Sequence, residues 1–403
     1  MNKHQHPLKA AMHFCLGIAL ASLSAAFVSC SSDDDPAVTS TDLTEEEAQS
    51  IDYSAANAAA WGNYSLNVAK LLANDSQLLY DTWKGSFASD FKSHTSASGY
   101  TSALSCVQQI IEGCIDIANE VGTAKIGEPV DFWTKGQTTK ALYAVESWYS
   151  WHSRDDYKNN IVSIANSVLG ERIDGSPADF SYDIATVNTS SIIAKCMMNE
   201  KLRPASIATW RAISAAWTAI DDIPQPFRNN IGSAEALTAM EACADLTASL
   251  EALNTLIAEN MSEEEAQDIV TRFVDNVALP TYAELVEKND ALLNAVKQLN
   301  ASPSDATFEA ACTAWLSARE PWEKSEAFLF GPVSSLGLDP NMDSWPLDAI
   351  GIANLLASQN WADLEWSGDY DEESEAIESA QSLRGYHTLE FLLFKNGKPR
   401  TVK

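Results

Sequence analysis

The chain has 403 residues, a formal net charge of −30 at pH 7 and a hydrophobic fraction of 46%. This length exceeds what one hydrophobic core normally organises, so two domains are expected, and the acid excess excludes nucleic-acid binding by phosphate neutralisation. The seven cysteines include no CxxC pair, which argues against a disulfide framework or a zinc knuckle.

The N-terminus has the pattern of a targeting segment. Two lysines precede an apolar run that ends at Val28, and small residues lead into Ser29 and Cys30, which is typical of a signal peptide with a lipoprotein cleavage site. We expect residues 1–29 to be removed, Cys30 to carry a lipid and residues 30–43 to form a polar tether. The prediction is therefore an outer-membrane lipoprotein of the cell envelope, either periplasmic or surface-exposed. A plain secretory signal is the alternative.

From Thr44 onward the composition favours helix almost throughout, because Ala, Leu, Glu and Ser dominate and alternating β-branched runs are scarce. Thr44 and Ser262 are each followed by three glutamates, which predicts capped helix starts. The expected helices are 44–79, 100–120, 138–169, 191–202, 204–220, 234–259, 262–300 with a kink at Pro280, and 304–330 with a break at Pro321. Residues 84–99 and 331–346 are expected to be irregular.

These helices predict an all-α fold of two similar four-helix bundles. We place the first domain at residues 44–260 and the second at 261–403. The glutamate-rich starts at Thr44 and Ser262 are consistent with a duplication.

An unusually dense mixture of aromatic and polar residues lies within the expected helix 138–169. Glu146, Ser150, His152, Asp156 and Asn160 fall at spacings that mostly place them on one side of such a helix. The simpler interpretation is the solvated face of an amphipathic helix. The alternative is that these side chains form one wall of a polar site.

A second candidate pair lies close to the C-terminus. His387 and Glu390 are three residues apart, so in a helix they share a face and can contact the same ion or substrate group. Gly385 suits a tight backbone entry into that helix. The simpler interpretation is again structural, with an ordinary histidine and glutamate at a helix start.

Three segments together resemble the imelysin-like proteins. They are 319–333, with Arg319 and Glu326; 342–348, with Asp343 and Trp345; and Gly385 to Glu390, which fits the GxHxxE signature in full. The resemblance implies an all-helical fold of two four-helix bundles, a functional site between them and a role in bacterial iron uptake. It also implies that the residues named in these motifs belong to that site, with Glu146, Ser150, Asp156 and Asn160 matching less tightly and the role of His152 open.

The order of the halves is unusual for a protein that resembles this family. GxHxxE occurs in the first half of most members, whereas here it ends the chain, and residues 146–170 and 220–227 resemble second-half sequence. We therefore interpret the chain as a circularly permuted member. Permutation is tolerated where the original termini lie close together.

Imidazole and carboxylate ligands are typical of sites for iron or another divalent metal, and less typical of zinc sites, which often use thiolates. The hypothesis is a metal site formed by His387, Glu390 and Glu326, which Glu146 or Asp156 can complete from across the domain cleft. In the opposing hypothesis, Arg319 and the polar residues from Ser150 to Asn160 bind a small polar ligand without metal. Arg319 and Glu326 can also form a purely structural ion pair.

The combined interpretation is an envelope lipoprotein that binds iron, an iron-containing ligand or a protein of the uptake machinery between two helical domains. One alternative is a metal-dependent peptidase that uses His387 and Glu390, and another is a non-catalytic interaction module. Neither HExxH nor HxxEH occurs in the chain, so no catalytic residue is assigned. The motifs therefore favour a non-enzymatic role and leave an enzymatic role open.

Overall fold

The computed structural model describes residues 43–180 and 188–402, which belong to one compact unit. The expected signal peptide 1–29, the lipidation candidate Cys30 and all but the last residue of the tether lie outside the described residues. No described helix has the length and apolar character needed to cross a bilayer.

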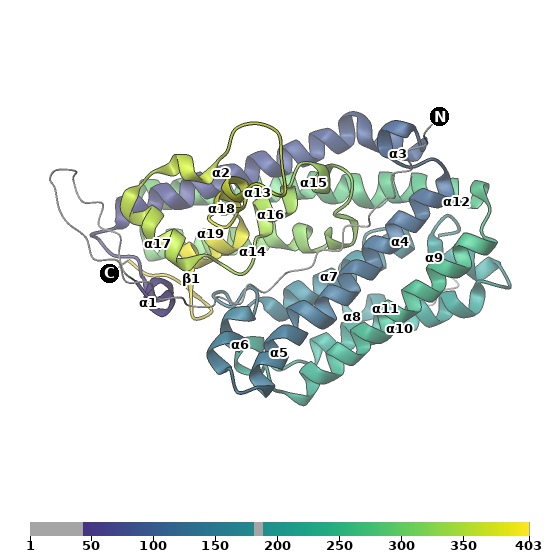
Figure 1. Ribbon diagram of the computed structural model, residues 1–403, viewed down its shortest axis with the longest axis horizontal. Coiled ribbons are helices and arrows are strands. Elements are labelled where there is room, and N and C mark those ends of the chain that lie inside the picture. The colour runs from purple at the N-terminus through teal and green to yellow at the C-terminus, as the bar shows by residue number, and fades with distance from the viewer. Residues whose placement is uncertain (1–42, 181–187, 403) are drawn as a thin grey trace, which may run out of the picture. The chain divides into compact units, whose positions relative to one another are not determined.

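The described part of the chain is all-α apart from one short antiparallel hairpin (Figure 1). The helices of its first half are α1 (Glu45–Ser50), α2 (Ala58–Thr82), α3 (Ala88–Lys92), α4 (Ala103–Glu120), α5 (Gly127–Thr134), α6 (Thr138–Ala144), α7 (Ser153–Leu169), α8 (Pro177–Phe180), α9 (Ile192–Met198) and α10 (Arg203–Asp221). Those that follow are α11 (Ala234–Asn260), α12 (Glu263–Phe273), α13 (Leu279–Ala301), α14 (Asp305–Glu323), α15 (Pro332–Ser335), α16 (Leu338–Asp343), α17 (Ala349–Ser358), α18 (Glu375–Gln381) and α19 (Tyr386–Leu393). The hairpin pairs β1 (Phe394–Lys395) with β2 (Lys398–Pro399).

The long helices pack in two groups. In one group α2 runs alongside α13, and α14 and α19 complete the packing; in the other, α4, α7, α10 and α11 pack together (Figure 1). The groups meet where α7 packs against α14. This contact brings polar residues of α7 and α14 into the interior.

The packing crosses the predicted domain boundary at residue 260. Helix α2 belongs to the predicted first domain but packs on α13, and α12 belongs to the predicted second domain but packs on α4. An apolar helix face indicates that a partner exists without indicating which helix it is, so sequence alone could not supply these pairings. The division into 44–260 and 261–403 stays a prediction.

Several expected helix boundaries are wrong. The expected helix 44–79 is interrupted between α1 and α2, and the expected helix 138–169 is interrupted by a loop between α6 and α7. The segment 84–99, expected to be irregular, contains most of a π-helical turn and α3, and the segment 331–346 contains α15 and α16. The last two differences arise because short helices carry too few residues for a recognisable period.

The expected break at Pro321 also needs correction, whereas the kink expected at Pro280 stays a prediction. Helix α14 continues through Pro321 to Glu323, because a proline so near the C-terminal end removes little of the helical hydrogen bonding. Pro280 lies in the first turn of α13, directly after the π-helical turn Val274–Ala278. The backbone stays helical from α12 through this turn into α13, so the π-helical turn is where the helix accommodates a residue without an N–H donor.

The predicted capped starts at Thr44 and Ser262 are confirmed. Each side-chain hydroxyl accepts a hydrogen bond from the backbone N–H three residues later, and the glutamate carboxylate at that position accepts one from the cap backbone N–H. The cysteines among the described residues are all free and buried, in agreement with their predicted role as small apolar residues.

Replacing Ser262 by alanine is expected to lower the free energy of unfolding by about 1 kcal/mol, because the N-cap acceptor at the start of α12 is lost. Hydrogen bonds from Ser262 lower the pKa of Glu265 below its ordinary value. The part of the stabilisation that the Glu265 carboxylate contributes is therefore present above the pKa of unfolded glutamate and is lost as the pH falls through the lower folded-state pKa. Urea denaturation at pH 7 and in acid tests this. If S262A lowered the free energy of unfolding as much in acid as at pH 7, the reciprocal cap would be contradicted.

Candidate functional site

Helix α19 carries the predicted pair His387 and Glu390 in the interior, where all eight of its residues are buried. Gly385 immediately precedes the helix with φ +94° and ψ −173°, a region that essentially only glycine adopts. A Cβ at this position would lie 2.6 Å from the Met342 carbonyl oxygen. Gly385 therefore allows α19 to start directly against α16.

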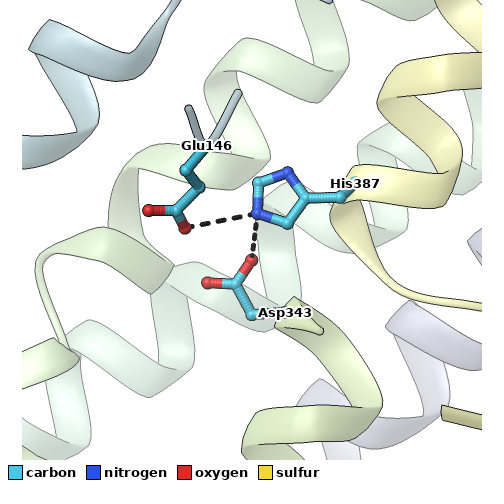
Figure 2. A group of neighbouring side chains, drawn as sticks. All are labelled: Glu146, Asp343 and His387. Atoms are coloured by element: carbon cyan, nitrogen blue, oxygen red, sulfur yellow. Dashed lines mark hydrogen bonds and ion pairs between the residues drawn. The ribbon is translucent and has the colours of Figure 1, made fainter. Parts of the chain in front are cut away.

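The imidazole of His387 lies between carboxylates from three parts of the chain (Figure 2). Its Nδ1 is 3.1 Å from Glu390 Oε2, and its Nε2 is 3.2 Å from Glu146 Oε1 and 3.1 Å from Asp343 Oδ1. The indole of Trp345 packs on the imidazole edge to face, with ring centroids 4.8 Å apart. Both imidazole nitrogens thus face acceptors, which favours the protonated ring.

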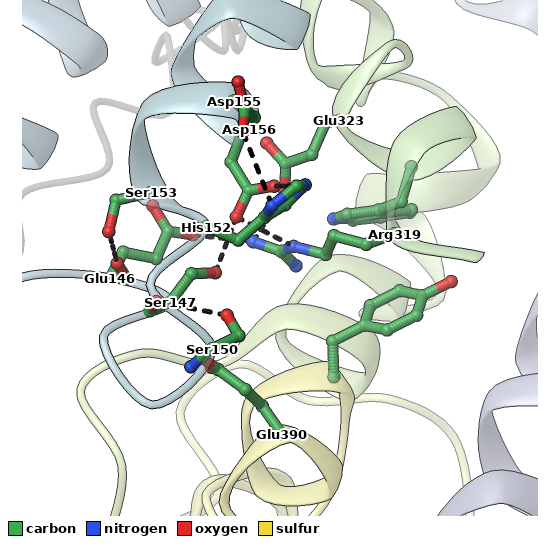
Figure 3. A network of polar contacts seen from close by, with 12 residues as sticks. Glu146, Ser147, Ser150, His152, Ser153, Asp155, Asp156, Arg319, Glu323 and Glu390 are labelled. Carbon is green, nitrogen blue, oxygen red and sulfur yellow. Dashed lines mark hydrogen bonds and ion pairs between the residues drawn. The ribbon is translucent and has the colours of Figure 1, made fainter. Parts of the chain in front are cut away.

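Arg319, on α14, is the centre of the network (Figure 3). Its Nη2 lies 2.9 Å from Glu146 Oε1 and 2.5 Å from Glu323 Oε1. Its Nη1 donates to Asp343, and its Nε is 3.6 Å from Asp156 Oδ2. The side chain is fully buried, so four carboxylates share one guanidinium in a medium that screens charge weakly. The Arg319–Glu326 ion pair considered from the sequence is not among these contacts.

Glu146 and Ser150 lie on the loop between α6 and α7, not on the expected helix 138–169. Ser147 and Trp151 in this loop have φ angles of +51° and +65°, a left-handed conformation that costs about 1–3 kcal/mol for a residue other than glycine. The loop positions Ser150 so that its backbone N–H donates to Glu390 Oε1, with nitrogen and oxygen 2.7 Å apart. Strained backbone of this kind clusters at functional sites, where surrounding contacts maintain it.

The remaining predicted site residues differ in how they contact the network around Arg319. Asn160 donates from Nδ2 to Glu323 Oε2 at 2.5 Å. His152 lies at the partly exposed edge, 3.8 Å from Asp156 Oδ1. Glu326 is buried near Glu323 and Asp343 instead of alongside the His387–Glu390 pair. The structure thus brings the predicted residues into one region but separates Glu326 from its expected companions.

The pKa shifts divide the carboxylates into two sets. Burial alone would raise the pKa of Glu146, but Lys125, His387 and Arg319 outweigh it and lower the pKa to about 2. Burial likewise opposes ionisation of Asp343, yet Arg319 and His387 hold its pKa below the ordinary value. Both side chains are therefore ionised at neutral pH.

The other set is held towards the neutral form. Burial raises the pKa of Asp156, Glu323 and Glu326, and raises that of Asp339 to about 7 with help from the charge of Asp343. Burial and Arg319 act to lower the pKa of His387, but its bonds to Asp343 and Glu146 outweigh both and raise it above the ordinary value. The site therefore has more carboxyl groups than cationic side chains, and burial holds the surplus ones towards the neutral form.

Two groups of described side chains bring three possible metal-ligand atoms within 4.8 Å of one another: Glu146, Asp343 and His387, and Glu323, Glu326 and Asp343. In the first group Arg319 Nη2 lies 2.9 Å from Glu146 Oε1 and 3.3 Å from His387 Nε2. Arg319 Nη1 also donates to Asp343, so all three members of the first group already contact the guanidinium. The first group as arranged does not fit a metal.

Sequence reasoning missed several members of the network. Lys125 forms an ion pair with Glu146 at 2.8 Å, and the Trp322 indole donates to Asp343 Oδ2 at 2.6 Å. Glu323 could have been found, since it lies one helical turn after Arg319 on α14. Lys125 gave no such signal, because it reaches the site from a separate π-helical turn after α4.

Comparison with known proteins identifies relatives. The family model described as imelysin matches residues 33–253 and 278–402. A crystal structure of an imelysin peptidase from Bacteroides ovatus is 52% identical with a TM-score of 0.82, and the match covers 88% of this chain and 100% of that one. These matches show the all-α fold of that family. The order of its halves, interpreted above as a circular permutation, stays a prediction.

Two further relatives share a printed name. Iron-regulated protein A of Synechococcus elongatus is 34% identical over 128 residues, which are 32% of this chain and 31% of that protein. A crystal structure of a putative iron-regulated protein A precursor from Parabacteroides distasonis is 36% identical, with a TM-score of 0.34 and coverage of 40% of this chain and 43% of that one. The matched stretch thus spans about a third of the curated relative.

Proposed function

Because the chain belongs to the imelysin family, we propose that it is an iron-related protein of the cell envelope that binds iron or an iron-containing ligand in the buried polar network around Arg319. The similarity to iron-regulated protein A supports the iron-related role. The lipoprotein pattern at Cys30 supports a membrane anchor and an envelope location. A protein of the uptake machinery is the partner proposed for delivery or release.

The observation that carries this proposal is the excess of buried carboxyl groups over cationic side chains inside the protein. The network contains the carboxylates Glu146, Asp156, Glu323, Glu326, Asp339, Asp343 and Glu390, and the cationic side chains Lys125, Arg319 and His387. Buried charges are normally paired or coordinate a metal. An interior that concentrates acids in this way attracts a cationic cargo.

The peptidase alternative is supported by the name of the Bacteroides ovatus relative but not by the geometry. His387 and Glu390 have 0% of their surface exposed, whereas a peptidase must bring a peptide bond against its general base. The Glu390 carboxylate also accepts from the Ser150 N–H and lies against His387 Nδ1. These contacts assign it a positioning role.

The test is an anaerobic titration of the full chain in detergent with ferrous iron, measured by competition with a colorimetric chelator. We expect about one iron per chain at micromolar concentration. The absence of iron binding would overturn the proposed cargo. Casein incubated with the same loaded protein should remain intact. Metal-dependent cleavage that disappears in Glu390→Gln would favour the peptidase instead.

A further inference from the structure

The second carboxylate group lies where α14 ends and α16 approaches it. Glu323 is the last residue of α14, Glu326 begins the following 3-10 turn, and Asp343 ends α16. One oxygen from each lies within 4.8 Å of one oxygen from each of the others. The group is therefore formed by rigid helix ends that position its side chains closely, as a ligand site requires.

Glu326 is the member of this group with the weakest contacts to the rest of the protein, and Lys125 is the main positive charge that acts on it. Its residue is only 7% exposed, yet no side chain or backbone group among the described residues donates a hydrogen bond to its carboxylate or forms an ion pair with it. A buried carboxylate without a partner is costly. In native structures such a group calls for an ion or water that completes it.

The two groups differ in how Arg319 reaches them. In the His387 group the guanidinium contacts all three members, at 2.9 Å from Glu146, at 3.3 Å from His387 and through a hydrogen bond to Asp343. In the second group it contacts Glu323 and Asp343 but not Glu326. In the first group every member therefore already contacts Arg319, whereas in the second group the Glu326 carboxylate does not.

We propose that Glu323, Glu326 and Asp343 bind a hard metal cation through carboxylate oxygens, and that His387 positions Asp343 without being a ligand. Three oxygen donors without thiolate or imidazole define the class, since hard cations such as Mn²⁺ prefer such ligands. The inference rests on the proposed function, because it locates the cargo within the same network. It differs from the site of His387, Glu390 and Glu326 expected from the sequence.

Neighbouring donors hold two of the ligands in place. The Trp322 indole donates to Asp343 Oδ2 at 2.6 Å, and Asn160 donates to Glu323 Oε2 at 2.5 Å. Donors of this type orient carboxylate ligands towards a metal. Glu326 supplies the remaining carboxylate and is the member whose removal disturbs the protein least.

The experiment compares Mn²⁺ binding to the full chain and to Glu326→Gln, by loss of the free-ion EPR signal at pH 7. Glutamine keeps the shape of the side chain and removes the charge, and we expect the affinity for Mn²⁺ to fall at least about tenfold. Glu320→Gln is the matched control, because Glu320 lies on α14 six residues before Glu326, is 53% exposed and pairs with Lys324. This control should bind as the wild type does.

The possible outcomes separate the two proposals. Wild type that binds iron but not Mn²⁺, or Glu326→Gln with unchanged affinity, would overturn this inference and leave the iron cargo standing. Mn²⁺ affinity that is lost in Glu390→Gln but retained in Glu326→Gln would also overturn this inference, and it would place the ion beside His387. Mn²⁺ binding that requires Glu326, without iron binding, would retain the site and reject the iron role. Glu326→Asp, which restores a carboxylate, should recover part of the affinity and guards against a folding defect in Glu326→Gln.

Discussion

Replacing Arg319 by methionine is expected to lower the free energy of unfolding by about 3–5 kcal/mol, which would make it one of the most damaging single changes in the chain. The guanidinium is fully buried and contacts Glu146, Glu323 and Asp343. Methionine fills a similar volume but leaves these carboxylates without their shared cation. The midpoint and slope of urea denaturation at pH 7 measure the loss.

The matched control for this prediction is Lys135→Met. Lys135 forms a surface ion pair with Asp131 in which both side chains are more than half exposed, and such pairs contribute about 0–1 kcal/mol. A loss in Arg319→Met no larger than in this control would contradict the central role of Arg319. Adding a cation that binds the carboxylates should recover part of the stability, because any ligand of the folded state stabilises it.

Replacing Gly385 by alanine is the second change with a large expected effect. The φ of +94° and ψ of −173° cost a residue other than glycine about 1–3 kcal/mol. The added Cβ would also lie 2.6 Å from the Met342 carbonyl oxygen, so α19 must move away from α16. We expect a loss of stability together with weaker cation binding, because Asp343 ends α16.

Gly368→Ala separates the two causes. Gly368 has φ +98°, but a Cβ there would meet no atom within 4 Å, so this variant should show only the backbone cost. Thermal unfolding and Mn²⁺ titration of both variants provide the comparison. Equal losses of stability, or unchanged binding in Gly385→Ala, would show that the close approach of α19 to α16 does not matter.

The sequence was most informative where a local physical rule decides the structure. The caps at Thr44 and Ser262 and the helix that carries His387 all follow from nearby residues and are confirmed. The loop between α6 and α7 was missed because its residues have helical spacing. What interrupts the helix is the positive φ at Ser147 and Trp151, which composition does not reveal.

The site could be predicted as a set of residues but not as an arrangement. The motifs identified Arg319, Asp343 and His387, and the structure brings them into contact. They could not show that Arg319 occupies the centre, because this depends on how α14 faces α7 across the packed interior. For the same reason Glu326 was grouped with His387, although the fold directs its carboxylate towards Glu323.

The packing of α2 on α13 has a consequence for how the chain is made. Thr82, where α2 ends, and Leu279, where α13 begins, are separated by about 200 residues, which take roughly 10–40 s to synthesise at about 5–20 residues per second. During this interval the apolar face of α2 has no native partner. The packing of α2 on α13 can therefore form only late in synthesis, and contacts between such distant segments slow folding.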